Sequence, residues 1–222
     1  MIEKVISFFV IALGKIKWEW LTKAMCGGRY YGLTAEDQQT ILDVLEKGNY
    51  IILTRRNSHL STYLENFAHW FLTFRWGHWG HACINVEYAE QNLLENACIL
   101  EAIGDGVKES RFLDVFDCDA VCILKPIMPE NIDWETVVSH GLSQLGKEYD
   151  SLFKYNDSGK FSCAELVLFC LSFIPNYEQK FHGLLAQVHI EKNVSPDMFI
   201  ESGSFNVVLE IRRKLKWQFF QF

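Results

Sequence analysis

The segment that most constrains this chain is a helix start that carries a cysteine. Ser162 and Glu165 form a Ser-x-x-Glu pair, and an apolar run from Leu166 to Phe173 follows them. This pattern is typical of a capping box, in which the serine and glutamate side chains each bond a backbone N–H at the beginning of a helix. The spacing therefore predicts a helix that runs to about residue 173, with Cys163 at its first position.

A thiol at the first position of a helix lies beside backbone N–H groups and the positive end of the helix dipole. Both favour an anion, so we expect Cys163 to ionise more readily than an ordinary cysteine, as a nucleophile must. The other six cysteines fit ordinary roles. Four lie in apolar segments and are expected to be small buried side chains: Cys83, Cys98, Cys122 and Cys170. The other two, Cys26 and Cys118, lack both a helix start and a nearby histidine.

Length and composition limit the classes of protein to consider. At 222 residues the chain is long enough for one domain with a substantial core. Its formal net charge of −7 argues against nucleic-acid binding. Seven cysteines without a Cys-x-x-Cys pair favour a reducing compartment over a disulfide framework or a zinc site. We therefore expect a cytoplasmic protein without a metal.

The N-terminal segment, residues 1–33, is predicted to be a helical appendage. Val5 to Leu13 is apolar apart from Ser7, and lysines flank it on both sides. Nine residues are too few to span a bilayer, and no small-residue cleavage site follows. An amphipathic helix here either packs on the domain or makes a peripheral membrane contact through residues 1–25.

The remainder, residues 34–222, reads as one α+β domain. Thr34 can cap a helix over residues 35–46, and apolar periodicity predicts further helices at 59–76 and 134–145. Short strands are predicted at 50–54, 82–86, 97–103, 120–124 and 205–211. Helices interspersed with short, closely spaced strands are typical of helices packed against a mostly antiparallel sheet.

His81 is the candidate base for Cys163. It follows Gly80 and begins a predicted strand, so its imidazole can project from a sheet edge towards a helix terminus, as in thiol hydrolases. Glu101 is a lone carboxylate in the apolar strand at 97–103, and pairing with His81 would offset the cost of burying it. The alternatives are an exposed edge position for Glu101 and His78 as the base.

An aromatic stripe precedes the histidine. Five aromatic residues recur at helical spacing between residues 63 and 74, and two tryptophans follow them. Such a stripe either buries one helix face in the core or forms a lid beside His81, which would suit a lipid-like or acylated substrate. The lid candidates are Trp70, Phe74 and Trp79.

A series of short motifs in this order resembles the permuted papain-like amidases, the YiiX/YebB-type branch of the NlpC/P60 superfamily. The resemblance covers about residues 34–200, and histidine precedes cysteine, the reverse of papain, because the sheet and the nucleophile helix have exchanged order. The segment from 59 to 79 is longer and more aromatic than the family's usual loop. The motifs are Gly80-His81-Ala82, Leu100-Glu101-Ala102, Gly106-Val107, Gly146-Lys147-Glu148-Tyr149-Asp150 and Ser162-Cys163-Ala164-Glu165-Leu166-Val167.

The resemblance implies a circularly permuted papain-like fold with Cys163 as nucleophile, His81 as base and Glu101 as the third polar residue. Tyr149 matches a tyrosine that lines the family's active site, and we expect it and the backbone at Ala164 to bind substrate or the oxyanion. The implied activity is hydrolysis of an amide, in a peptide or cell-wall fragment, or of an ester, through an acyl-enzyme and without a cofactor. Two alternatives stay open: a lipid-directed acyltransferase or phospholipase, and a non-catalytic binding domain.

Overall fold

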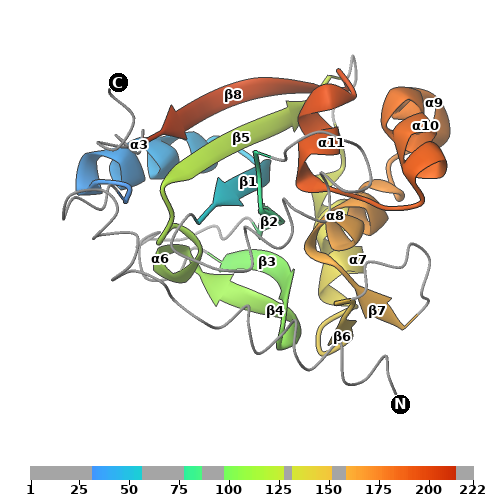
Figure 1. Cartoon of the computed structure of the whole chain (residues 1–222), viewed down its shortest axis with the longest axis horizontal. Helices are drawn as coiled ribbons and strands as arrows, with labels where there is room; N and C mark the ends of the chain where they lie inside the picture. Colours follow the sequence, from blue (N-terminus) through green and yellow to red (C-terminus); the bar gives the residue numbers. More distant parts are fainter. Residues whose placement is uncertain (1–31, 57–77, 87–97, 128–131, 152–158, 214–222) are drawn as a thin grey trace, which may run out of the picture.

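The computed structural model describes residues 32–56, 78–86, 98–127, 132–151 and 159–213 (Figure 1). A six-stranded antiparallel sheet with strand order β4-β3-β2-β1-β5-β8 forms its centre. The class is therefore mixed α+β with an antiparallel sheet, as predicted. The strands are β1 (Ile51–Arg55), β2 (His81–Val86), β3 (Cys98–Ile103), β4 (Gly106–Arg111), β5 (Ala120–Pro126) and β8 (Phe205–Arg212).

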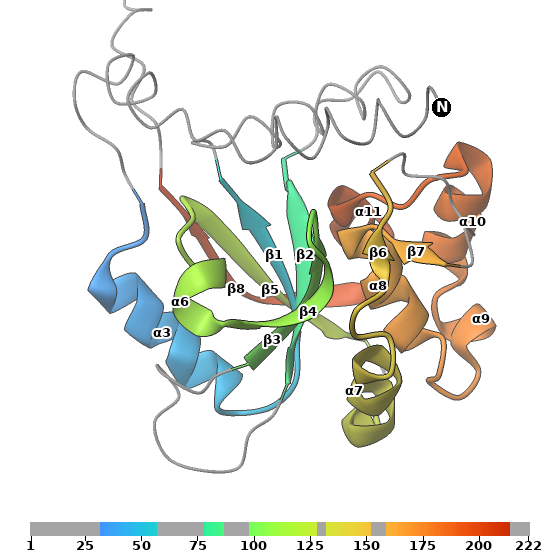
Figure 2. The same ribbon diagram turned by 90° about the horizontal axis from the view of Figure 1, so that it is seen from below.

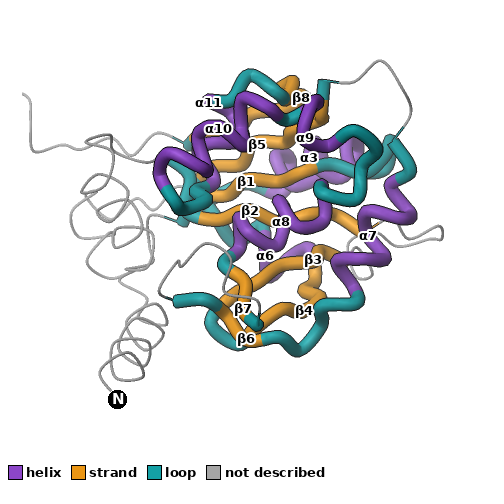
Figure 3. The backbone as a smooth tube through the Cα atoms, turned by 90° about the vertical axis from the view of Figure 1, so that its right-hand side faces the viewer, coloured by secondary structure: helices purple, strands orange, loops and turns teal. Residues whose placement is uncertain are grey.

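Helices cover both faces of this sheet (Figure 2). One face carries α3 and α6, and the other carries the remaining helices. Figure 3 shows α8 over β2, with α10 and α11 towards β5 and β8. The helices are α3 (Ala35–Leu45), α6 (Phe112–Val115), α7 (Trp134–Leu142), α8 (Cys163–Leu171), α9 (Tyr177–Lys180), α10 (His182–Glu191) and α11 (Pro196–Glu201).

Alternation along the strands divides the buried side chains into two cores. On β2, Ala82 and Ile84 belong to the cluster that includes α8, whereas Cys83 belongs to the cluster that includes α3 and α6. Successive residues of a strand point to opposite faces, so His81 points to the same face as Cys83. This alternation decides which core each site residue can reach.

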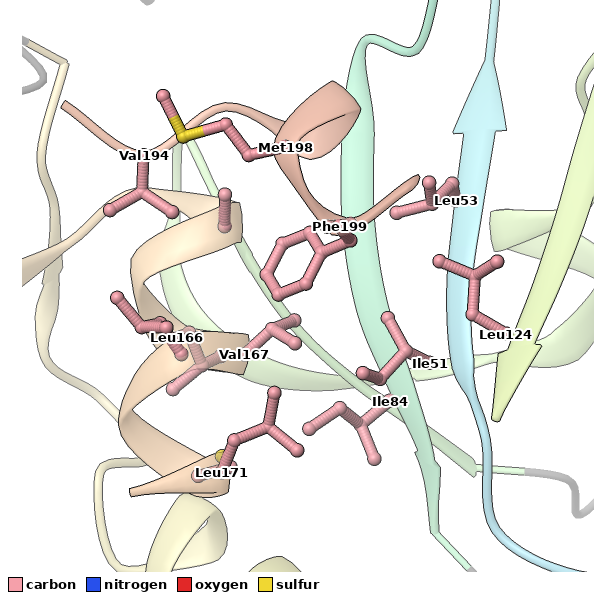
Figure 4. Close-up of a cluster of buried hydrophobic side chains, with 14 of the residues drawn as sticks. Ile51, Leu53, Ile84, Leu124, Leu166, Val167, Leu171, Val194, Met198 and Phe199 are labelled. Atoms are coloured by element: carbon pink, nitrogen blue, oxygen red, sulfur yellow. The ribbon is translucent and has the colours of Figure 1, made fainter. Parts of the chain in front are cut away.

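Helix α8 packs along β2 and β3 with its apolar side. Figure 4 shows Val167 and Leu171 directed towards Ile51 and Ile84. All of them are almost fully buried, which provides roughly 1.5–3 kcal/mol of stabilisation for each side chain removed from water. This contact fixes the position of α8 along the sheet, and therefore the position of its first residue.

Most predicted elements are present with boundaries that differ by one or two residues. Thr34 caps α3 through a capping box with Asp37, and Asp133 caps α7. Two helices are shorter than predicted: α7 ends at Leu142 and α8 at Leu171. In both, the next residues form turns bonded three residues back instead of four, which is the tightening common at helix ends.

Several elements were not predicted from the sequence. Strand β4 was not, because its polar residues lie at the edge of the sheet, where the alternation of apolar and polar residues is weak. The short strands β6 (Glu148–Tyr149) and β7 (Lys160–Phe161), and helices α6, α9, α10 and α11, lack a strong periodic signal.

Some predictions fall on residues that the structure does not describe. The predicted helix at 59–76, with Trp70 and Phe74, and nearly all of the segment 1–33 lie outside the described residues. Within the described ranges, no helix combines the length and the apolar character that crossing a membrane requires.

We predict that Gly141→Ala destabilises the protein although alanine favours helices. A Cβ at Gly141 would lie closer than van der Waals contact to Leu100 and to the sulfur of Cys170, where α7 meets α8 and the sheet. Both neighbours are buried, so overpacking is expected to lower the free energy of unfolding by about 1–3 kcal/mol. Ser139→Ala, on the exposed side of the same helix, serves as the control for helix propensity. Urea unfolding of both variants measures the difference, and a stabilised Gly141→Ala would contradict this packing.

Candidate active site

The capping box at the start of α8 is present as predicted. Ser162 Oγ accepts a hydrogen bond from the Glu165 N–H at 3.3 Å, and Glu165 Oε2 accepts one from the Ser162 N–H at 2.9 Å. The helix therefore begins at Cys163. Within the described part of the chain, the Ala164 N–H has no acceptor, which leaves a donor directed out of the helix start.

Cys163 lies at the same end of the sheet as His81. Leu171, in the last turn of α8, packs beside Ile84, and Cys163 is about 12 Å further along the helix axis at 1.5 Å per residue (Figure 4). His81 is about 10 Å from Ile84 along β2 in the same direction. Cys163 and His81 are therefore displaced by similar distances, in the same direction, from the contact between Leu171 and Ile84.

His81 and Glu101 are in contact. His81 Nε2 lies 2.7 Å from Glu101 Oε2, and their side chains are 17% and 6% exposed. The exposed edge position that we considered for Glu101 is therefore wrong. Their catalytic roles remain predictions.

The environment of Glu101 keeps it ionised. Burial by itself would raise the pKa of Glu101, but the hydrogen bond and charge of His81, the hydrogen bond from Ser110 and the charge of Arg56 together lower it to about 2. A carboxylate can only accept hydrogen bonds, so the proton of the contact lies on His81 Nε2. In neutral His81 the lone pair is then on Nδ1, which is the nitrogen that could receive a proton from a thiol.

Ser110 is a site residue that the sequence analysis missed. Its hydroxyl donates a short hydrogen bond to Glu101 Oε1, while Glu101 Oε2 contacts His81. A signal was present in the alternation from Gly106 to Arg111, but it identifies Ser110 only once the register between β3 and β4 is known.

The pairing of β2 with β3 is incomplete at the end where His81 lies. These strands pair only from Ile84 to Val86, although the full lengths of both are described. The pKa of Cys83 is raised mainly by burial, and then by the charges of Glu101 and Cys163. Cys83 belongs to the α3 face, whereas the helix that begins at Cys163 covers the other face of the sheet.

Three other thiols of the described chain are poor nucleophiles. Burial raises the pKa of Cys118, Cys122 and Cys170 to about 12, so these groups stay protonated at neutral pH. The six described cysteines do not form disulfides with one another. Cys83, Cys122 and Cys170 are buried as predicted, and Cys118 is buried as well. Cys98 is only partly buried, so the prediction of a buried side chain is wrong for it: it begins β3, and its sulfur contacts the exposed Glu109 carboxylate.

His78 occupies a different environment from His81. It is exposed, and its backbone N–H donates to the Asp197 carboxylate at 2.9 and 3.1 Å. The next N–H, of Trp79, also donates to Asp197. Asp197 therefore anchors the chain just before β2 through backbone N–H groups. The contact between an imidazole and the Glu101 carboxylate is made by His81, not by His78.

The remaining predicted site residues lie near the start of α8 or in the core. Tyr149 on β6 pairs with Phe161 on β7, two residues before Cys163. Ala164 is buried in the core. Trp79 is 3% exposed, belongs to the α8 core, and has the Arg212 guanidinium over its ring, so it occupies the core position of the two that we considered.

We predict that the stability provided by Glu101 depends on pH. Its folded pKa of about 2 is below the ordinary glutamate pKa of 4.5, so its stabilising contribution is present above pH 4.5 and is lost as the pH falls towards 2. Glu101→Gln should be less stable than the parent at pH 7, by on the order of 3 kcal/mol at most, and the difference should shrink over this window.

Chemical unfolding at a series of pH values measures this difference. Glu178→Gln, on the exposed side of α9, is the control and should differ little from the parent at any pH. A constant difference between parent and Glu101→Gln from pH 2 to pH 5 would show that the charge of Glu101 contributes nothing.

Comparison with known proteins gives one structural likeness. The sequence matches no protein-family model and no curated protein. Among solved structures, the chain is similar to one described as the metalloprotein yiiX from Escherichia coli O157:H7, DUF1105, with 16% sequence identity and a TM-score of 0.47. The match covers 75% of this chain and 97% of that chain. The described residues of this chain contain no group of three or more His, Cys, Asp or Glu side chains that could hold a metal ion. Its function is therefore argued from its own side chains.

Proposed function

We propose that this protein is a cysteine hydrolase that cleaves an amide or ester bond through an acyl-enzyme on Cys163. The observation that carries the proposal is the 2.7 Å contact between His81 and Glu101, at the end of the sheet where α8 begins. A histidine held by a carboxylate, with a cysteine at a neighbouring helix start, suits the roles of base, orienting acid and nucleophile. The motif order, with His81 before Cys163, supports a circularly permuted papain-like fold.

The reaction proceeds in two balanced steps. In the first, His81 Nδ1 takes the proton of the Cys163 thiol, and the thiolate attacks the carbonyl carbon of the substrate. The leaving amine or alcohol departs with the proton from the imidazolium, and a thioester remains on Cys163. In the second, His81 takes a proton from water, and the resulting hydroxide attacks the thioester carbonyl carbon. The C–S bond breaks, the carboxylic acid is released, and the Cys163 thiolate takes the proton back from the His81 imidazolium.

The start of α8 supplies the groups that bind the developing oxyanion. The capping box uses the N–H groups of Ser162 and Glu165, so the Ala164 N–H remains for a ligand. Such donors stabilise the tetrahedral intermediate where negative charge develops on the carbonyl oxygen. Tyr149 lies beside the strand that leads into this helix and would contact the acyl or leaving group. Suitable substrates are peptides, cell-wall fragments and acylated, lipid-like compounds.

We predict that Cys163 forms an acyl-enzyme with a simple activated ester. Incubation with p-nitrophenyl acetate should release a burst of about one equivalent of p-nitrophenol, and intact-mass and peptide analysis should place one acetyl group on Cys163. Cys163→Ala should abolish the burst, and His81→Ala should slow acetylation by about 10²–10⁴-fold because it removes the base.

Cys98→Ser is the matched control, since it removes a thiol on β3 that is not fully buried. It should acetylate at the parent rate. A parent protein that acetylates Cys163 no faster than Cys98 would leave a binding domain on this scaffold as the better description.

A further inference from the structure

We infer that Ser110 is a positioning residue that fixes the Glu101 carboxylate and, through it, the tautomer and orientation of the His81 imidazole. This inference rests on the proposed function, because it assigns Ser110 a role in the same site. The contact that carries it is the hydrogen bond from the Ser110 hydroxyl to Glu101 Oε1.

The register of β3 and β4 brings the two residues together. Ser110 pairs with Ile99, and Glu101 pairs with Lys108, so Ser110 and Glu101 are diagonal neighbours on one face of the hairpin. Ser110 is buried, and a buried hydroxyl is costly unless it is hydrogen-bonded. The carboxylate of Glu101 satisfies it, rather than a backbone group.

The two oxygens of the carboxylate have different partners. Oε2 contacts His81 and Oε1 accepts from Ser110, so both ends of the carboxylate are held. The last torsion of a glutamate side chain is broad and has no sharp minimum of its own. Without Ser110, the carboxylate of Glu101 would turn more freely, and the proton on His81 Nε2 would lose its fixed acceptor.

The role of Ser110 is orientation rather than charge. His81 and Arg56 also favour the ionised form of Glu101, and they remain when the hydroxyl is removed. Arg56 Nη2 donates to the carbonyl oxygens of Asp114 and Val115 at 2.5 and 3.0 Å, which fixes the guanidinium independently of Ser110. Removing the Ser110 hydroxyl should therefore leave Glu101 charged but poorly oriented.

A double-mutant cycle on the full-length chain tests this role. Ser110→Ala should lower kcat for p-nitrophenyl acetate by about 10-fold with little change in KM, which corresponds to the loss of one charge-assisted hydrogen bond. Ser110→Thr keeps the hydroxyl and should restore the rate. In a Glu101→Ala background, Ser110→Ala should have no further effect, because the carboxylate through which Ser110 acts on the imidazole is already absent.

The tautomer of His81 gives a readout that does not depend on turnover. Nitrogen-15 NMR of the imidazole should show the Nε2–H form in the parent protein and in Ser110→Thr, and a mixture in Ser110→Ala. Ser172→Ala removes a hydroxyl that bonds only a backbone carbonyl in its own helix end and is the control for both measurements. Should Ser110→Ala fail to fold, Ser110→Cys, with a weaker donor of similar size, replaces it.

The outcomes separate this inference from the proposed function. An unchanged tautomer and rate in Ser110→Ala, or an equal loss in the parent and Glu101→Ala backgrounds, overturns the role of Ser110 while Cys163 stays the nucleophile. Full activity of Cys163→Ala overturns the proposed hydrolase. A shifted His81 tautomer in Ser110→Ala would still show, in that case, that Ser110 positions the imidazole through Glu101.

Discussion

A carboxylate buried inside the sheet is the constraint on which this structure depends. Glu101 lies in a strand whose neighbours are apolar, and a charge there is costly unless it is compensated. Compensation comes from three directions: His81 on β2, Ser110 on β4, and the charge of Arg56 just after β1. These partners require β2, β3 and β4 to keep one register, because a shift of one residue would turn Glu101 to the opposite face.

The two faces of the sheet carry different parts of the candidate site. The α3 face carries the hydrogen-bonded side chains of Ser110, Glu101 and His81. The α8 face carries the apolar contact that positions the helix beginning at Cys163. The helix that begins at Cys163 and the strand face that carries His81 therefore lie on opposite sides of the sheet.

Local patterns predicted much of the fold. The capping box of α8, the buried strand β1 and the helix α3 follow from residues within four positions of one another, and the structure contains all three. Strand β4 could not be predicted from the sequence, because its polar residues are equally typical of a loop and only pairing with β3 identifies them as a strand. Ser110 was missed for the same reason, and the segment with Trp70 and Phe74 lies outside the described residues.

The amino-acid sequence by itself determined where α8 begins, that Cys163 is its first residue, and that His81 begins a strand. Each depends on hydrogen bonds and periodicity between near neighbours, which any helix or strand of that sequence would keep. Only the tertiary structure decided that Glu101 contacts His81, that Ser110 completes the contact, and that Trp79 is buried in the core. Those outcomes depend on strand order and register, which are set by packing between segments far apart along the chain.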